Sequence, residues 1–431
     1  MTNNILRLLG MKTRNYKNLS MGDNGVDFEN LNVFIGSNGS GKSNLINIFR
    51  FLRDSIEDVS AEDRGVTSFD DAVSALGGER MLDFTLQRPA NVEFLFKFSP
   101  TDINPKGGAL DIHLFIQKIG KVFNNYEVLY DTVSIPGRAE PFYYYKCHDI
   151  KSGTGVFSLY KDKSKNTAHF EPLPDVPTNR LALAHISRML EESTHPPEIT
   201  PVYKFRRELV DAISKWRFYN ANDMNLYAIR HAEPKIGSSD LYLSTSGENL
   251  SLVLFNLIHE DLRFEEQIEN AIKAILPNTK RVRAGHSGRL SLTVEWYFEN
   301  MGKTPFYLNE MSDGTVRMLC WAIILHSPFL PPLLSIDEPE IGLHPAWMPI
   351  LAEWIKRASQ KAQIFISTHS ADLLDHFTDC LDNVYCFSTK NESHFEIKKL
   401  PKNELQPKLD EGWQLGDLYR VGDPSVGGWP W

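Results

Sequence analysis

The residues from Gly36 to Ser43 can bind phosphate. They read GSNGSGKS and fit the pattern G-x-x-x-x-G-K-[ST]. Glycine lets backbone N–H groups turn toward an anion, and a following helix directs its positive end to the same place. We expect Lys42 to reach the β- and γ-phosphates and the Ser43 hydroxyl to ligate Mg²⁺. The predicted nucleotide-binding residues are Gly36, Ser37, Asn38, Gly39, Ser40, Gly41, Lys42, Ser43 and Asn44.

Two acidic residues much later in the chain complement this loop. Asp337 and Glu338 end the apolar run PLLSI, which is typical of a buried strand. Ligands of open α/β sheets bind at the carboxyl ends of the strands. Asp337 therefore suits the Mg²⁺ shell in the Walker B role. Glu338 is predicted to act as the catalytic base that polarises the attacking water.

Two further stretches carry candidate residues. His369 follows the apolar run QIFIS, where its imidazole could hydrogen-bond the γ-phosphate or the water. Ser312, Asp313 and Gly314 precede an apolar helical pattern. Ser312 is a good N-cap, and the same serine with the following N–H groups could contact an anion from another subunit.

The pattern around these motifs predicts an α/β fold. A short apolar run precedes the phosphate loop and a helical period follows it. From 81 to about 173 the period becomes two, as in an antiparallel β-meander, and from 179 to about 269 it becomes helical. The predicted regions are 1–80 and 305–400 for two ATPase lobes, 81–178 for the β region, 179–304 for a mainly helical insertion, and 401–431 for a C-terminal tail.

Composition excludes several classes of protein. The 431 residues carry a net charge of −9, so any nucleic-acid contact needs a local basic patch. The N-terminus does not resemble a signal peptide, and the longest apolar run, Met318 to Leu325, is too short to span a bilayer. The four cysteines have no C-x-x-C spacing, so a zinc site or disulfide framework is not expected. A cytoplasmic protein without a membrane partner is predicted.

The order of the motifs carries a resemblance. GSNGSGKS, MSDGT, IDEPEIGLHP and STHS occur in the order Walker A, signature, Walker B with D-loop, and switch histidine. This resembles the ABC-type P-loop ATPase head of the RecF, SMC and OLD proteins, and above all the compact bacterial AAA-family ATPases of that group. The resemblance implies one sheet that is split by the β-meander and the helical insertion.

The resemblance also implies a dimer. ATP would be held between two heads, with Ser312, Asp313 and Gly314 of one head facing the phosphate loop of the other. Asp313 and Thr315 depart from the transporter signature LSGGQ, which counts against a transporter subunit. Gln87 is the candidate for a Q-loop glutamine near the metal, although a surface glutamine is the simpler interpretation.

The resemblance suggests two roles. Similar ATPases occur in two-gene anti-phage systems, where the chain would be a sensor and scaffold for a separate effector such as a TOPRIM or HNH nuclease. The residues after His369 contain no D-x-D, so no nuclease activity is expected in this chain. The alternative is a RecF-like DNA-repair clamp, supported by a basic patch that could equally be a solvated hairpin. The patch comprises Lys280, Arg281, Arg283 and Arg289.

Overall fold

The computed structural model describes most of the chain. The described residues are 6–56, 68–87, 90–99, 110–119, 122–131, 142–149, 154–162, 167–173, 176–185, 201–389 and 394–427. They fall into two compact units, each assembled from separate segments. Unit 1 comprises Met1–Glu29, Asn38–Trp216 and Cys386–Lys398, and unit 2 comprises Asn30–Ser37, Arg217–Tyr385 and Lys399–Trp431.

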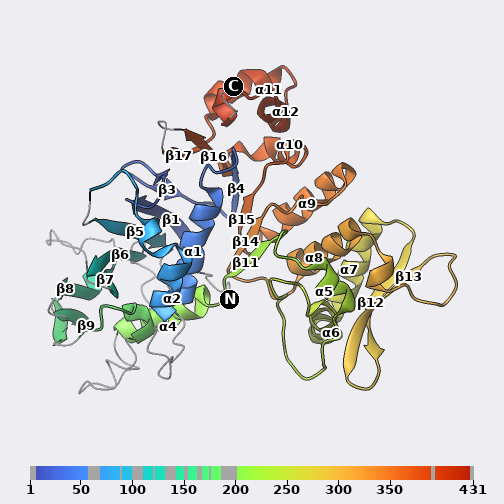
Figure 1. Cartoon of the computed structure of the whole chain (residues 1–431), viewed down its shortest axis with the longest axis horizontal. Coiled ribbons are helices and arrows are strands. Elements are labelled where there is room, and N and C mark those ends of the chain that lie inside the picture. The colour runs from blue at the N-terminus through green and yellow to red at the C-terminus, as the bar shows by residue number, and fades with distance from the viewer. Residues whose placement is uncertain are drawn as a thin grey trace. The chain divides into compact units, whose positions relative to one another are not determined.

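Unit 1 contains an antiparallel sheet with the strand order β10-β9-β8-β7-β6-β5-β1-β3. Consecutive strands from β5 to β10 are neighbours, so this part of the chain is the expected β-meander. Figure 1 labels the strands β5 to β9 of this meander. The strands are β1 (Leu8–Arg14), β3 (Val26–Asp27), β5 (Asn91–Phe98), β6 (Leu110–Ile119), β7 (Val122–Asp131), β8 (Phe142–Asp149), β9 (Thr154–Asp162) and β10 (Thr167–Leu173).

The core of unit 1 lies between this sheet and helix α1 (Lys42–Ile56). Strand β5 alternates between buried and half-buried residues, as the period of two predicts. Phe51 of α1 lies 5.8 Å from Phe94 of β5 and 6.0 Å from Phe69 of helix α2 (Ser68–Ala75), measured between ring centroids. Such aromatic contacts fix the helix that begins at the phosphate loop.

Unit 2 is built on parallel strands. The order is β11-β14-β15-β4, and β16 (Val384–Thr389), of which Val384 and Tyr385 belong to this unit, follows β4. β11, β14, β15 and β4 run parallel to one another (Figure 1). Their bounds are Arg217–Asn220, Leu333–Asp337, Gln363–Ser367 and Leu31–Gly36. β4 and β15 are buried throughout, as expected for a parallel sheet covered on both faces.

Helices and a hairpin complete unit 2. α8 contains the apolar run Met318 to Leu325, which is buried among neighbouring helices that include α7 and α9. No helix in the described ranges is both long and apolar enough to cross a membrane. The helices are α5 (Leu226–His231), α6 (Leu250–Glu260), α7 (Leu262–Ile275), α8 (Asp313–His326), α9 (Met348–Ala358), α10 (Ala371–Leu374), α11 (Lys402–Asp410) and α12 (Leu415–Arg420), and the hairpin is β12 (Thr279–Ser287) with β13 (Ser291–Phe298).

One element differs from the expected pattern. The sequence suggested a helix that continues to Tyr219, but α4 (Pro201–Ile213) ends earlier and Arg217–Asn220 form β11. Phe218 and Tyr219 are buried, and β11 pairs in parallel with β14. Pairing with β14 thus overrides the helical period of this run. The aromatic residues in the run also favour strands. Of the helix expected from Asn179, residues 179–185 lie within the described residues, and 182–185 of these are helical.

Candidate active site

The phosphate loop joins β4 to α1. The backbone angle φ is +77° at Gly39 and +98° at Gly41, a left-handed conformation that glycine adopts readily. No atom lies within 4 Å of a Cβ added at Gly39, so the loop is open there. Lys42 is 5% exposed, and its Nζ lies 3.4 Å from Ser40 Oγ. Ser43 is exposed in the first turn of α1. The loop therefore has the backbone and the side-chain placement that phosphate binding needs.

A second cation lies beside the start of α1. Lys17 Nζ donates a hydrogen bond of 2.9 Å to Asn44 Oδ1 and lies 5.3 Å from the centroid of the Tyr16 ring. Partial burial lowers the pKa of Lys17. Lys17 has a positive φ of 47° and precedes the short strand β2 (Leu19–Ser20). No motif in the sequence marks this lysine, because its neighbour Asn44 is distant in the chain.

The parallel sheet of unit 2 brings the other candidate residues to one edge. In its register Asn220 lies opposite Asp337, Asp337 opposite Ser367, and Ser367 opposite Phe34. These residues end β11, β14 and β15, and β4 ends nearby at Gly36, the first residue of the phosphate loop. Because all four strands are parallel, their carboxyl ends meet where ligands of open α/β sheets bind.

Asp337 is fixed by both neighbouring strands. Ser367 Oγ donates a hydrogen bond to its Oδ1, and Asn220 Nδ2 donates one of 3.0 Å to its Oδ2. The backbone N–H of Ala221 also donates to the Asp337 carbonyl at 3.2 Å. Both carboxylate oxygens are thus oriented by polar side chains, as is common for carboxylates that bind metal ions.

Glu338 occupies a strained backbone conformation. Its φ is +52°, which costs a residue with a Cβ about 1–3 kcal/mol. The strained residue faces two partners: His369 Nε2 lies 3.2 Å from Glu338 Oε1, and Asn222 Nδ2 lies 3.3 Å from Oε2. The side chains of Glu338 and His369 are 27% and 28% exposed, so water can reach them. This arrangement can polarise a water molecule.

Glu340 fixes the turn that carries His369. Its Oε1 accepts hydrogen bonds from Thr368 Oγ1 at 2.6 Å, the His369 N–H at 2.9 Å and the Ser370 N–H at 3.1 Å. Burial raises the pKa of Glu340, while these donors act in the opposite direction. Sequence reasoning missed this residue, although its place in the run DEPE beside Asp337 and Glu338 was a usable signal.

The signature residues begin helix α8. Ser312 is the N-cap, and its Oγ accepts a hydrogen bond of 3.3 Å from the Thr315 N–H. A Cβ added at Gly314 would lie 3.0 Å from both the Gly342 carbonyl oxygen and the Trp347 ring. The glycine is therefore required for close packing against the segment that follows Walker B. Asp313 stands in the first turn and is 66% exposed.

Gln87 belongs to unit 1, whereas Asp337 belongs to unit 2. Gln87 is exposed in a turn region after the short 3₁₀ helix Gly78–Met81. The side-chain amide that the structure places against Asp337 is that of Asn220, at the end of a strand that the sequence pattern did not reveal. Asn222, beside Glu338, was missed for the same reason.

The basic residues near β12 are largely paired. Arg281 contacts Glu265 at 2.5 Å and Glu269 at 3.7 Å, while Arg283 contacts Glu295 at 2.8 Å. Lys280 and Arg289 are exposed. Two of the four predicted patch residues therefore have their charge balanced within the hairpin and helix α7, as expected for a solvated hairpin.

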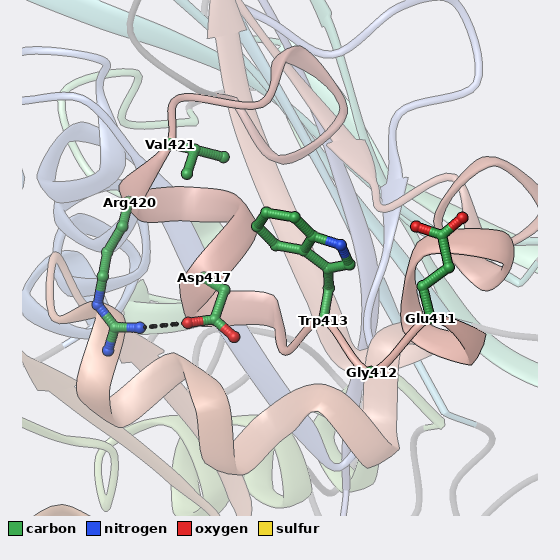
Figure 2. Close-up of a pocket in the computed structure, with 6 residues that line it drawn as sticks. All are labelled: Glu411, Gly412, Trp413, Asp417, Arg420 and Val421. Atoms are coloured by element: carbon green, nitrogen blue, oxygen red, sulfur yellow. Dashed lines mark hydrogen bonds and ion pairs between the residues drawn. The ribbon is translucent and has the colours of Figure 1, made fainter.

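A hollow of about 340 Å³ lies in the C-terminal tail (Figure 2). The Trp413 indole stands between Glu411 and Asp417, and Arg420 donates to Asp417 at 2.8 Å. The helix α12 that lines it also carries Tyr419, whose hydroxyl donates to the Gly36 carbonyl at 3.3 Å. The hollow contains none of the predicted site residues. It is lined by Glu411, Gly412, Trp413, Asp417, Arg420 and Val421.

One family model matches most of the chain. The family model described as "AAA domain, putative AbiEii toxin, Type IV TA system" matches residues 31–375. That range begins at β4 and includes the phosphate loop, the signature, Asp337, Glu338 and His369. No curated protein matches the chain.

Solved structures of SMC heads match this chain. An SMC head bound to the C-terminal winged-helix domain of ScpA is 13% identical with a TM-score of 0.50, covering 92% of this chain and 99% of that one. The SMC head domain from Thermotoga maritima is 12% identical with a TM-score of 0.42, covering 91% of this chain and 98% of that one. The first likeness confirms the predicted fold class, an α/β P-loop ATPase head whose sheet is interrupted by insertions.

Proposed function

The chain belongs to this family of AAA domains, and we propose that it binds ATP with Mg²⁺ and hydrolyses it to ADP and phosphate. The phosphate loop would hold the β- and γ-phosphates with its N–H groups and Lys42. The Ser43 hydroxyl and the Asp337 carboxylate would hold Mg²⁺, which prefers oxygen ligands. When bound, that ion supplies positive charge against the phosphate oxygens. The orientation of both Asp337 oxygens supports this fit.

Glu338 would act as the general base. Its carboxylate would take a proton from a water molecule as the water oxygen bonds to the γ-phosphorus and the bond to the β-phosphate oxygen breaks. His369 would keep the carboxylate and the water aligned, and Asn222 would hold the other carboxylate oxygen. The observation that carries this proposal is the strained Glu338 backbone, whose side chain is held by two polar partners at the edge where β4 ends.

Replacement of the base tests this mechanism. In Glu338→Gln we expect ATP binding to persist and turnover to fall by roughly 10²- to 10⁴-fold, since the amide cannot accept the proton. The control is Glu353→Gln, which changes an exposed carboxylate in α9 of the same unit. Turnover measured with purified protein should stay unchanged in the control. Normal turnover in Glu338→Gln would refute the assigned base.

We further propose that ATP joins two copies of the chain. The signature end of α8, with Ser312 as its N-cap and Gly314 in its first turn, would face the phosphate loop of the second copy, and hydrolysis would release the pair. The exposure of Asp313 supports this surface role. Sedimentation with ATP should show a dimer that persists in Glu338→Gln, whereas a monomer under these conditions would contradict the proposal.

The proposed biological role is control of a separate effector in anti-phage defence. The family description refers to a toxin of a toxin–antitoxin system, which supports a link to a toxic activity. The effector would be a nuclease of the TOPRIM or HNH class. A pull-down from the native locus, with wild type and Glu338→Gln compared, should retain such a protein in stoichiometric amount. Retention of DNA with repair factors instead would favour the clamp alternative, which the paired charges of Arg281 and Arg283 do not support.

A further inference from the structure

Arg230 contacts the turn that precedes α8, from Leu308 to Asp313, which is here called the signature turn. Arg230 lies at the end of α5, within the insertion that separates the ATPase motifs. Its Nε donates to the Leu308 carbonyl at 3.2 Å, and its Nη2 donates to the Met311 carbonyl at 2.9 Å and to Asp313 Oδ1 at 2.5 Å. One guanidinium group thus binds the turn before α8 at two backbone positions and pairs with the first helical residue.

The two charged groups of this pair have very different exposure. The Arg230 side chain is 19% exposed, whereas that of Asp313 is 66% exposed. The arginine is therefore embedded behind the turn, and the carboxylate stands on the outer side. Because the guanidinium of Arg230 is already held by backbone acceptors, it loses little further side-chain conformational entropy when it pairs with a neighbouring charge.

Asp313 poses an electrostatic problem for the proposed dimer. A carboxylate in the first turn stabilises a helix through the helix dipole. The same position would face the γ-phosphate of ATP that a second copy holds. Two anions on one helix terminus repel each other, so the signature of this chain needs a compensating positive charge. Arg230 is the cation that the structure provides at Asp313.

The segment that carries Arg230 also reaches the other half of the site. Asn220 and Asn222 contact Asp337 and Glu338, and α5 begins shortly after them. The Arg317 guanidinium of α8 donates to the Ala221 carbonyl between the two asparagines. The signature turn and the Walker B acids are therefore attached to one short stretch of the insertion, which limits their independent movement.

We propose that Arg230 is a positioning residue of the signature: it neutralises Asp313 and fixes the turn from Leu308 to Asp313, so that α8 can accept the γ-phosphate of ATP bound by a second copy. This inference rests on the proposed ATP-dependent dimer. It identifies the side chain that makes an acidic signature compatible with an anionic ligand.

The test is a double-mutant cycle in the Glu338→Gln chain, in which we expect ATP to be retained. The variants are Arg230→Gln, Asp313→Asn and the double variant, and the readout is the ATP concentration at half-maximal dimerisation, measured by sedimentation. Arg230→Gln should raise this concentration about tenfold, because Asp313 is then uncompensated. Asp313→Asn should lower it about threefold, because Arg230 then attracts the phosphate. The double variant should return to within about threefold of the parent.

A matched control variant removes a different ion pair between an arginine and an aspartate. Arg263 contacts Asp261 at 3.0 Å in the same unit but on α7, so Arg263→Gln should leave dimerisation unchanged. Equal impairment of Arg230→Gln and the double variant would overturn the inference, because a purely structural role would not depend on the charge of Asp313. If the parent forms the dimer and Arg230→Gln does not weaken it, the inference about Arg230 is overturned while the proposed dimer stands. Absence of an ATP-dependent dimer in the parent would overturn the proposed dimer and the inference together.

Discussion

The phosphate loop and the acidic sheet edge are built in different ways. The loop is a contiguous run whose glycines adopt the backbone angles that phosphate binding needs. The acidic edge collects Asn220, Asp337 and Ser367 from three strands that are distant in the sequence. A contiguous loop is specified by local residues, whereas the edge is specified by the order of parallel strands. The comparison shows that a motif reveals its own residues but not their neighbours in the sheet.

The largest combined effect on ATP binding and turnover is expected from the contiguous loop. Lys42→Ala should reduce ATP turnover at least about a hundredfold, because the mutation removes the cation assigned to the phosphates. Binding of a fluorescent ATP analogue should weaken as well, which distinguishes this variant from Glu338→Gln. The exposed Lys273→Ala on α7 serves as the control. If Lys42→Ala binds and hydrolyses ATP normally, the loop does not have the assigned role.

An intermediate effect is expected at the sheet edge. Asn220→Ala should lower turnover by about tenfold and raise the Mg²⁺ concentration needed for half-maximal activity, because the orienting partner of Asp337 is lost. Gln87→Ala should change both quantities less than about twofold, since Gln87 is exposed and the amide that contacts Asp337 is that of Asn220. Titration of activity with Mg²⁺ measures the difference. A larger effect at Gln87 than at Asn220 would support the glutamine as the metal-site residue.

The smallest effect on activity is expected at Glu127 in unit 1, whose carboxylate affects the stability of the fold instead. Burial raises its pKa from 4.5 to about 8, although the Ala182 N–H donates to it. A raised pKa means that stability is fully present below pH 4.5 and is lost as the pH rises through about 8. At about 1.4 kcal/mol for each pH unit, the loss is at most about 5 kcal/mol.

Thermal unfolding at several pH values checks this. The unfolding midpoint of the wild type should fall between pH 6 and pH 9, and Glu127→Gln should remove most of that fall, since an amide does not ionise. Asp71→Asn, at an exposed position of α2, should keep the wild-type dependence. An unchanged pH dependence in Glu127→Gln would show that its carboxylate is not the group responsible.

Much of the fold could be predicted from periodicity. The period of two predicted the antiparallel meander, and apolar helical spacing predicted α6 and α8. The strand β11 could not be predicted in this way, because Trp216 to Tyr219 continue a helical period and carry aromatic residues suited to either state. Its pairing with β14 decides the outcome. The missed strand explains why Asn220 and Asn222 were missed as well.

The sequence by itself determined the phosphate loop, the acids Asp337 and Glu338, and the signature serine as an N-cap. Their chemistry depends on residue type and on local backbone preferences, and both are defined by residues that are close together in the sequence. Only the tertiary structure decided which polar groups surround them: Asn222 and His369 at Glu338, and Arg230 at Asp313. Those contacts arise from strand order and helix packing over long sequence separations, so no local pattern specifies them.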